Sequence, residues 1–191
     1  MDNPIGVLRE EHEKILEILN LVEQTADDIE NGASVDPQLL ADILEFIRLF
    51  ADQCHHGKEE DLLFPALAKK GFPTDAGPIG VMMMEHERGR AYVAEMSEAM
   101  NRCVERDPSA PRDWVDAAHR YVELLQNHIA KENNILFVMA ERMLDARELR
   151  DLETAFGKAE LPSVGNATQS RLAERLGKLR AKAAWPLAPV K

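Results

Sequence analysis

Two copies of one short pattern constrain the fold of this chain more than any other feature. The segments HHGKEEDLLF and HIAKENNILF begin at His55 and His128, align without a gap and are separated by 73 residues. Both contain His-x3-Glu, followed by two aliphatic residues and Phe. A His and a Glu four residues apart lie on one face of an α-helix. The pattern therefore predicts a helix in each half of the chain that directs an imidazole and a carboxylate toward an apolar layer.

A second repeat places a single histidine on the helix that precedes each copy. Glu11-His12-Glu13 aligns with Glu85-His86-Glu87 at a separation of 74 residues. Each half of the chain thus carries one lone His on its first helix and one His-x3-Glu on its second. We interpret this arrangement as two helical hairpins that are related by a pseudo-two-fold axis.

Four apolar stripes with helical periodicity divide most of the sequence, and no alternating pattern of useful length predicts a strand. Capping residues followed by proline suit the first turn of a helix. Residues 1–142 are therefore predicted to form an all-α, up-down-up-down four-helix bundle. We expect its helices from Asn3-Pro4 to Asn31-Gly32, from Asp36-Pro37 to Pro65, after Gly77-Pro78, and from near Asp113 after a loop with Pro108 and Pro111.

Residues 143–191 are predicted to be a C-terminal helical extension and tail. Residues 145–158 can form a short fifth helix, residues 169–184 have a basic helical pattern, and the chain ends in WPLAPVK. Because this part carries no recognisable chemistry, we expect it to pack on the outside of the bundle or on another subunit, which is compatible with a homo-oligomer.

Composition and charge exclude several classes of partner. The net charge is -11, from 23 basic and 34 acidic side chains, whereas a nucleic-acid-binding protein requires a basic surface. An anionic membrane surface is disfavoured for the same reason, and no apolar run approaches the ~20 residues of a membrane span. The two cysteines are too few for a disulfide scaffold, and the first residues do not resemble a signal peptide. We therefore expect a cytoplasmic protein with neither nucleic acid nor membrane as a partner.

The repeat also predicts which of two adjacent histidines faces the core. Steps of four, eight and eleven residues back along the helix lead from His55 to an alanine and two aliphatic residues. The same steps lead from His56 to three charged residues, which is typical of a solvated face. We therefore expect His55 to point inward and His56 to lie at the edge. Whether His56 or Glu60 is an additional metal ligand stays open.

Six side chains should then converge inside the bundle as metal ligands. Unpaired carboxylates in a dry core cost several kcal/mol each, and metal ions relieve that cost. Six donors exceed the four of a structural zinc site, so the set fits two ions better than one. The glutamates would bridge these ions, which lie roughly 3.5–4 Å apart in dinuclear sites. Mixed imidazole and carboxylate ligation suits iron, with manganese or zinc as alternatives. The predicted ligands are His12 and His55 for one ion, His86 and His128 for the other, and Glu59 and Glu132 as bridges.

This set of residues resembles the hemerythrin HHE cation-binding domain over residues 5–142. The resemblance rests on the six positions and on the sequences LLFP and ILF that follow the two His-x3-Glu pairs. It implies a four-helix bundle with an oxygen- or hydroxide-bridged di-iron centre, in a family of dioxygen carriers, oxygen or iron sensors, and proteins of nitric oxide and peroxide stress. The carriers have a further His one turn after the third-helix His, where this chain has Arg90. The chain therefore resembles the sensor and stress-response branches more closely.

The sequence thus predicts a non-haem di-iron protein that binds dioxygen or a related small ligand, for sensing, storage or a stress response. The alternative is a di-iron enzyme that acts on peroxide or nitric oxide, which needs the same ligands. A purely structural metal site is a third interpretation. Two other site classes fit poorly, because the chain has neither the Glu-x-x-His pairs of ferritin-like bundles nor the His-Glu-x-x-His of zinc proteases.

Overall fold

The computed structural model describes residues 3–159, and all regular secondary structure in this part of the chain is helical. No strand occurs among these residues, so the all-α prediction is confirmed for them. The long elements are α1 (Pro4–Glu30), α2 (Pro37–Phe46), α4 (Gly77–Val104) and α5 (Ala110–Lys131). The shorter ones are η1 (Ile47–His56), η2 (Glu59–Leu63), α3 (Phe64–Ala68), η3 (Glu132–Leu136), α6 (Phe137–Met143) and α7 (Ala146–Ala159).

Local capping signals explain where the first two helices begin. The side chain of Asn3 accepts a hydrogen bond from the backbone N–H of Ile5 at 3.1 Å, and Pro4 occupies the first turn of α1. At the start of α2, the side chain of Asp36 accepts from the N–H of Gln38 at 2.9 Å. Such caps satisfy N–H groups that have no partner within the helix. Both predicted helix starts are therefore confirmed.

Prolines account for two differences from the predicted boundaries. Helix α5 begins at Ala110 instead of near Asp113, because Pro111 is tolerated in a first turn, where its missing N–H would have no helical partner. The prediction that Pro65 ends the second helix is wrong, since the chain stays helical through α3 to Ala68. The π-helical η2 ends at Leu63, two residues before this proline, and its wider turn interrupts the α-helical hydrogen-bond ladder that the proline would otherwise break.

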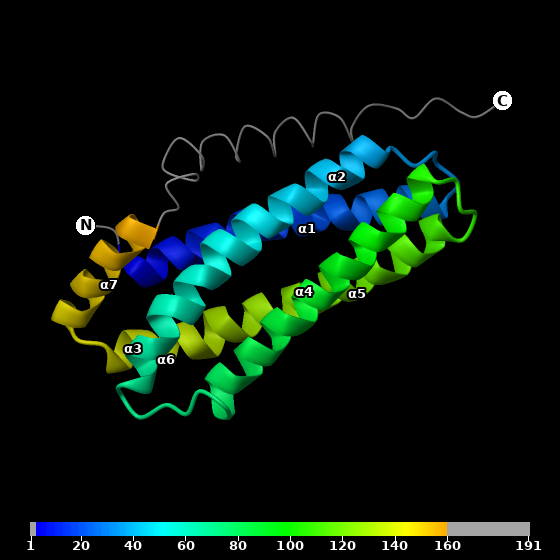
Figure 1. Ribbon diagram of the computed structural model, residues 1–191. Helices are drawn as coiled ribbons and strands as arrows, with labels where there is room; N and C mark the ends of the chain where they lie inside the picture. Colours follow the sequence, from blue (N-terminus) through cyan, green and yellow to red (C-terminus); the bar gives the residue numbers. More distant parts are fainter. Residues whose placement is uncertain (1–2, 160–191) are drawn as a thin grey trace.

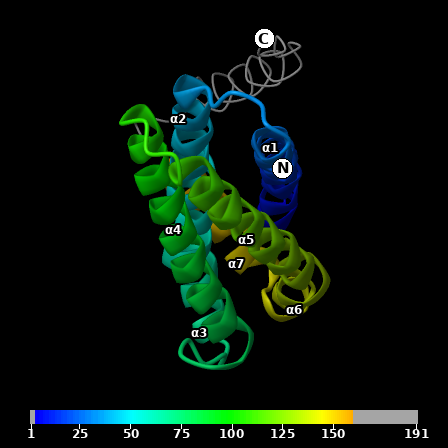
Figure 2. The ribbon, with the colours of Figure 1, turned by 90° about the vertical axis from the view of Figure 1, so that its right-hand side faces the viewer.

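Four long helical segments lie side by side in Figure 1: α1, the segment from α2 to α3, α4, and the segment from α5 to α6. Connections at residues 31–36, 69–76 and 105–109 join them. The view in Figure 2 shows α1 beside α5 and α2 beside α4, and α4 also packs along α5. The segments thus enclose a shared interior.

Among the described residues, the hydrophobic core consists of two clusters that are separated along the helices. On α1, Ile15 belongs to the larger cluster and Leu8 to the smaller one, and His12 lies between them. Ile129 of α5 belongs to the larger cluster, whereas Leu136 of η3 belongs to the smaller one. A polar layer therefore crosses the molecule between two apolar regions, at the level of the repeated motifs.

Helix α7 corresponds to the predicted fifth helix, shifted by one residue. Its side chains Leu152 and Phe156 are buried in the smaller hydrophobic cluster together with Ile5 and Leu8 of α1, and Figure 1 shows α7 near the beginning of α1. This part of the extension therefore packs on one end of the helical assembly. The predicted basic helix at residues 169–184 and the final WPLAPVK lie outside the described residues.

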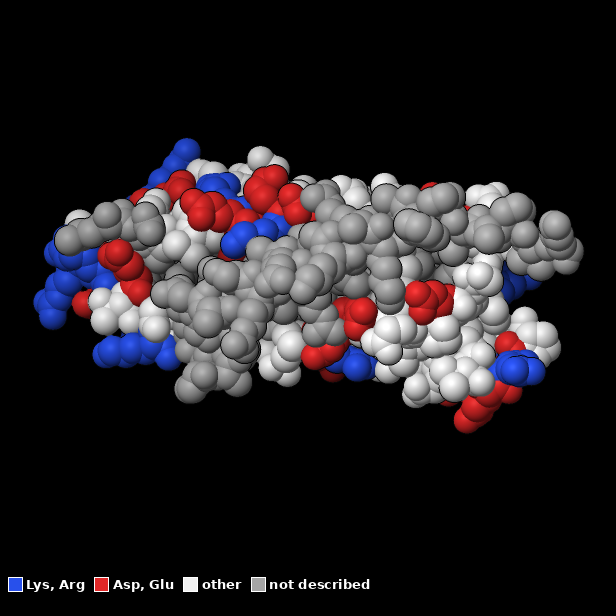
Figure 3. All heavy atoms as spheres, turned by 90° about the horizontal axis from the view of Figure 1, so that it is seen from above, with Lys and Arg blue, Asp and Glu red and all other residues white. Residues whose placement is uncertain are grey.

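Charged side chains of both signs lie near one another on the face that Figure 3 presents. Among the ion pairs of the described residues are Lys70–Glu148 at 2.8 Å and Arg120–Glu95 at 2.6 Å. Within residues 3–159, none of the helices combines the length and the apolar character that crossing a membrane requires.

Candidate metal centre

The structure brings the six predicted ligands together in the polar layer. Each comes from a different element, and each side chain is at most 1% exposed. The two π-helical segments η2 and η3 begin at Glu59 and Glu132, so the repeat is also present in the backbone. Short π-helical turns are frequent at functional sites.

Four imidazoles direct the same nitrogen toward the centre of the layer. In each of them Nδ1–H donates to a side-chain oxygen further out, so Nε2 keeps its lone pair for the interior. This orientation is typical of metal-binding histidines, whose other nitrogen is held by a carboxylate or carbonyl oxygen. The four hydrogen bonds are His12–Asn133 (3.0 Å), His55–Glu11 (3.1 Å), His86–Glu60 (2.7 Å) and His128–Glu85 (3.0 Å).

Each of the two inner glutamates lies between histidines of both hairpins. Two donor atoms that bind one ion at about 2.1 Å, at right angles to each other, lie about 3 Å apart. The distances between glutamate Oε2 and histidine Nε2 are close to that value. They are 3.6 Å for Glu59–His55, 3.5 Å for Glu59–His86, 3.1 Å for Glu132–His12 and 3.3 Å for Glu132–His128.

The donor atoms fall into two groups, and within each group they all lie within 4.8 Å of one another. Each group contains the two histidines of one hairpin, as the sequence predicts, and Glu59 belongs to both groups. One group also contains His56, which the sequence places at the edge. The groups are His12, His55, Glu59 and Glu132, and His56, Glu59, His86 and His128.

Buried polar atoms without partners indicate that cations belong in this layer. Among residues 3–159, both carboxylate oxygens of Glu59 and of Glu132 are buried without a hydrogen-bond partner, and so is Nε2 of His12 and of His55. Each such atom costs on the order of 1–3 kcal/mol. Two divalent cations would bind these atoms and neutralise the carboxylates. The residues present therefore fit a dinuclear metal site, and metal binding by each of them stays a prediction.

Burial keeps imidazoles of the layer in the neutral form that binds metals. It lowers the pKa of His55 and of His56 well below the ordinary value, and it also lowers the pKa of His86. Burial raises the pKa of Glu59 well above its usual range, and the charge of Glu132 adds to that increase. Two carboxylates this close do not both ionise readily unless a cation lies between them.

Two Glu–Lys pairs lie just outside the layer, and the sequence alone did not reveal their role. Glu11 accepts hydrogen bonds from Nδ1–H of His55 and from Nζ of Lys58. Glu85 accepts the equivalent pair of hydrogen bonds in the second hairpin. The signal was present in the sequence, because the repeats align Glu11 with Glu85 and Lys58 with Lys131.

The position of His56 corrects the prediction that it lies at the edge. Its side chain is only 4% exposed, and its ring stacks on that of His86 with centroids 3.8 Å apart. The reason is η1, which is π-helical up to His56. A π-helix bonds residues five apart, so its turns contain more residues than α-helical turns. Steps of four, eight and eleven residues therefore mispredict the buried face here, and His55 and His56 are both buried.

Arg90, which stands where oxygen carriers have a further histidine, holds two carboxylates outside the layer. Its Nε donates to Asp52 Oδ1 at 2.8 Å, and its Nη2 donates to Glu60 Oε1 at 2.7 Å. Glu60 also accepts from Nδ1–H of His86. Glu60 is therefore an outer partner of that histidine and belongs to neither inner group.

Removing metal from the loaded protein should lower its melting temperature by about 10 °C. A ligand present at about 1,000 times its dissociation constant stabilises a fold by ~4 kcal/mol, and each kcal/mol corresponds to about 2–4 °C in a chain of this size. Thermal unfolding before and after treatment with a chelator checks this. The same metal added back should restore the higher temperature, and an unchanged melting temperature after complete metal removal would contradict the fit of the layer to cations.

Comparisons with known proteins agree with the geometry of the layer. The family model of the Hemerythrin HHE cation binding domain matches residues 3–140. An uncharacterized protein of Mycobacterium tuberculosis (strain ATCC 25618 / H37Rv) is 24% identical over 160 residues, which is 84% of this chain and 62% of that protein. The iron-sulfur cluster repair protein YtfE of Escherichia coli (strain K12 / DH10B) is 34% identical over 90 residues, which is 45% of this chain and 40% of that protein.

The matched region thus spans less than two thirds of the length of these relatives. The family model, in contrast, covers well over half of this chain and includes all six predicted ligands. On that basis, the chain belongs to the hemerythrin HHE cation binding domain family.

Proposed function

We propose that this protein is a non-haem di-iron protein that binds dioxygen or a related small ligand. The observation that carries the proposal is the group of buried glutamate oxygens and histidine nitrogens that lack hydrogen-bond partners among the described residues. We infer further that the four long segments form the up-down-up-down bundle of the family, with the metal centre in its interior and residues 143–191 as an appended extension.

Iron is the metal that the donor set suits best. Neutral imidazoles combined with carboxylates bind iron well, whereas sites for magnesium or calcium consist mainly of oxygen donors. Manganese and zinc accept the same donors, but zinc has no redox chemistry. When bound, two adjacent iron ions would supply electrons to a small oxidising ligand. The part of the protein is to hold the donors, to neutralise the ions with Glu59 and Glu132, and to exclude bulk water.

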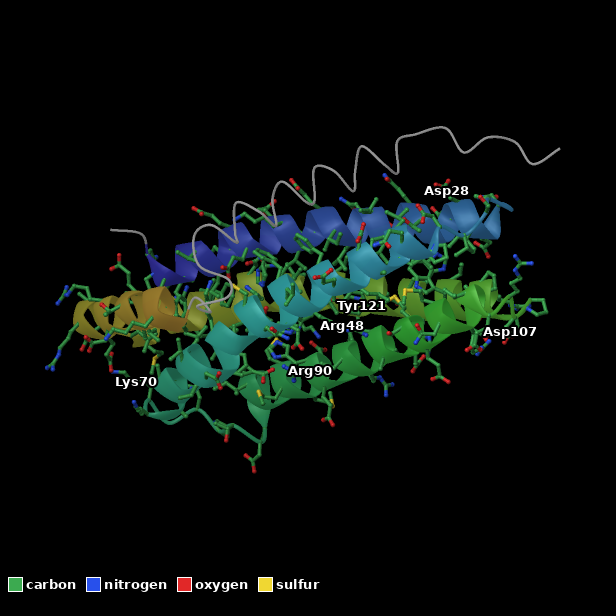
Figure 4. All side chains as sticks on the ribbon, turned by 45° about the horizontal axis from the view of Figure 1, so that its top comes forward. Asp28, Arg48, Lys70, Arg90, Asp107 and Tyr121 are labelled. Carbon is green, nitrogen blue, oxygen red and sulfur yellow. The ribbon has the colours of Figure 1, made fainter. Side chains whose placement is uncertain are left out.

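A pocket gives small molecules a route from the surface toward the layer. Its volume is ≈ 330 Å³, and its lining includes His56, which also belongs to one of the inner donor groups. Figure 4 labels three further lining residues, Arg48, Arg90 and Tyr121, which come from η1, α4 and α5. A water molecule occupies about 30 Å³ in the liquid, so dioxygen, nitric oxide or peroxide fits easily. The pocket therefore supports a small-ligand function over a purely structural metal site.

A di-iron enzyme that acts on peroxide or nitric oxide is the second candidate. The observation that favours it is the match, over 45% of this chain, to a protein named for the repair of iron-sulfur clusters. A role of that kind lies closer to a stress response than to the transport of dioxygen. Both candidates use the same donors and the same pocket, so reactivity has to separate them.

Anaerobic reduction, followed by separate additions of dioxygen, peroxide and nitric oxide, tests both candidates. We expect elemental analysis to find two iron ions per chain and optical spectra to change rapidly with at least one ligand, because the pocket extends to His56 of one donor group. A binding protein takes up a stoichiometric amount of the ligand, whereas an enzyme consumes many equivalents of peroxide or nitric oxide. One metal ion per chain, or no optical response to any of the three ligands, would overturn the proposed function.

A further inference from the structure

The polar layer contains one imidazole more than the repeat provides. At the separation of 73 residues His55 aligns with His128, but His56 aligns with Ile129. Ile129 is buried in the larger hydrophobic cluster, as expected of an aliphatic side chain. The hairpins therefore differ at this position, since one of them buries a polar ring, which is costly unless the ring has partners.

His56 lies among the donors of the second hairpin. The centroid of its ring is 3.8 Å from that of His86 and 5.8 Å from that of His128. One of its ring nitrogens lies within 4.8 Å of a donor atom in each of Glu59, His86 and His128. His12 and His55 are not part of this group. The ring is thus placed to bind the ion of the second hairpin.

The outer surroundings of His56 resemble those of the predicted ligands, with a longer contact. Its Nδ1 makes no hydrogen bond within residues 3–159 but lies 3.5 Å from Asp52 Oδ1, and Asp52 accepts a hydrogen bond from Arg90 Nε at 2.8 Å. An imidazole, a carboxylate and a cation therefore follow one another outward, in the same order as around His55. A carboxylate on the outer nitrogen is what holds a metal-binding histidine in its orientation.

Arg90 connects His56 to a predicted ligand of the same group. Besides Asp52, this arginine holds Glu60, which accepts from Nδ1–H of His86 at 2.7 Å. One guanidinium thus fixes the carboxylates next to both imidazoles. Such a shared outer partner is expected when both rings must point to the same ion.

We propose that His56 is a fifth imidazole ligand, which binds the same ion as His86 and His128. The proposal rests on the dinuclear centre proposed above. It makes the two metal positions unequal, with three imidazoles at one ion and two at the other, although the repeat by itself predicts two at each.

Anaerobic titration of the metal-free protein with Fe(II) tests this assignment in His56→Ala and His56→Gln. We expect affinity at one of the two positions to fall by at least the roughly 10–100-fold that loss of an outer partner causes. The glutamine variant keeps a polar side chain in the layer, so it remains informative if the alanine variant fails to fold. His119→Ala is the matched control, because His119 is 41% exposed and its ion-pair partner Asp27 is exposed as well.

Spectroscopy of the iron-loaded proteins gives a readout that does not depend on activity. Mössbauer spectra of the wild type should contain two distinct iron signals, and those of His56→Ala should contain two similar ones, because each ion then has two imidazoles. X-ray absorption should detect five imidazoles over two irons in the wild type and four over two in the variant.

The outcomes separate this proposal from the function on which it rests. Unchanged affinity and spectra in both His56 variants, together with metal loss in His55→Ala, would overturn the role of His56 and leave the dinuclear centre in place. Full metal binding in His55→Ala as well would overturn the centre itself. An altered pH profile of ligand binding at unchanged metal content would make His56 a proton-transfer group of the pocket, which also overturns the proposal.

Discussion

Replacing Glu59 by glutamine should remove metal from both positions, although the side chain keeps its size. Glu59 is the residue that the two donor groups share, and its Oε2 lies 3.6 Å from His55 Nε2 and 3.5 Å from His86 Nε2. A neutral amide neither bridges two cations nor neutralises their charge. The affinity should fall by more than the roughly 10–100-fold that loss of an outer partner causes, so elemental analysis of the purified variant should find little metal.

The matched control for this variant is Asp61→Asn. Asp61 lies in the same π-helical segment as Glu59, but its side chain is exposed. The substitution makes the same change of charge at the surface of η2, so the variant should keep its metal. Wild-type metal content in both Glu59→Gln and Asp61→Asn would rule out a bridging role for Glu59.

In the metal-free protein, Glu59→Gln should stabilise the fold. Burial and the charge of Glu132 raise the pKa of Glu59 in the folded state. The folded state therefore favours the protonated carboxyl of Glu59. Its contribution to the free energy of unfolding is fully present below the pKa of an unfolded glutamate, about 4.3, and is lost as the pH rises through the higher folded pKa. Thermal unfolding of metal-free wild type and Glu59→Gln between about pH 4 and pH 8 should show a growing advantage for the variant. A constant difference across this range would contradict the assigned pKa.

Replacing Glu11 by glutamine should destabilise the metal-free protein by about 3–5 kcal/mol, the usual cost of removing one partner of a buried ion pair. Lys58, the cationic partner of Glu11, is 2% exposed, so water cannot solvate its charge after the carboxylate is lost. In the equivalent pair of the second hairpin, the Lys131 side chain is 37% exposed. Loss of the ion pair in Glu85→Gln should therefore cost only about 1 kcal/mol or less.

Unfolding of the metal-free variants measures this difference without interference from metal loss. A cost of 3–5 kcal/mol corresponds to a decrease of about 6–20 °C in melting temperature. The double variant Glu11→Gln/Lys58→Met should regain most of that loss, because it also removes the buried charge. Equal losses in Glu11→Gln and Glu85→Gln would show that the burial of Lys58 does not determine the effect.

Local signals in the sequence were sufficient for the starts of the first two helices and for bringing six of the seven inner donors to one layer. Asn3 and Asp36 cap the helices that follow them, and capping depends on only a few neighbouring residues. The pairs His55/Glu59 and His128/Glu132 each lie on one continuous helical segment, so their spacing puts both donors on one face. Interactions between residues only a few positions apart can be predicted from a sequence, because the helical backbone that connects them fixes their relative positions.

The outer carboxylates were visible in the sequence, but their partners were not. The repeat aligns Glu11 with Glu85, yet the histidine that Glu11 holds is His55, at a distance of 44 residues along the chain. Only the packing of α1 against η1 brings the two together. A pattern of residues within one helix contains no information about which side chain of a neighbouring helix lies opposite.

The sequence by itself determined the helical segments and two equivalent sets of donors, one from each hairpin. The tertiary structure decided the difference between the two sets, which is the additional histidine His56 in one of them. The pattern before His56 fits an α-helix, and in that register His56 would face solvent. Instead η1 is π-helical, a conformation with little intrinsic stability that persists where surrounding packing and polar contacts compensate. Its wider turns bury His56 beside His86 and leave Asp52 within reach of Arg90. The number of residues in a helical turn responds to the packing of neighbouring helices, so periodicity alone does not predict it.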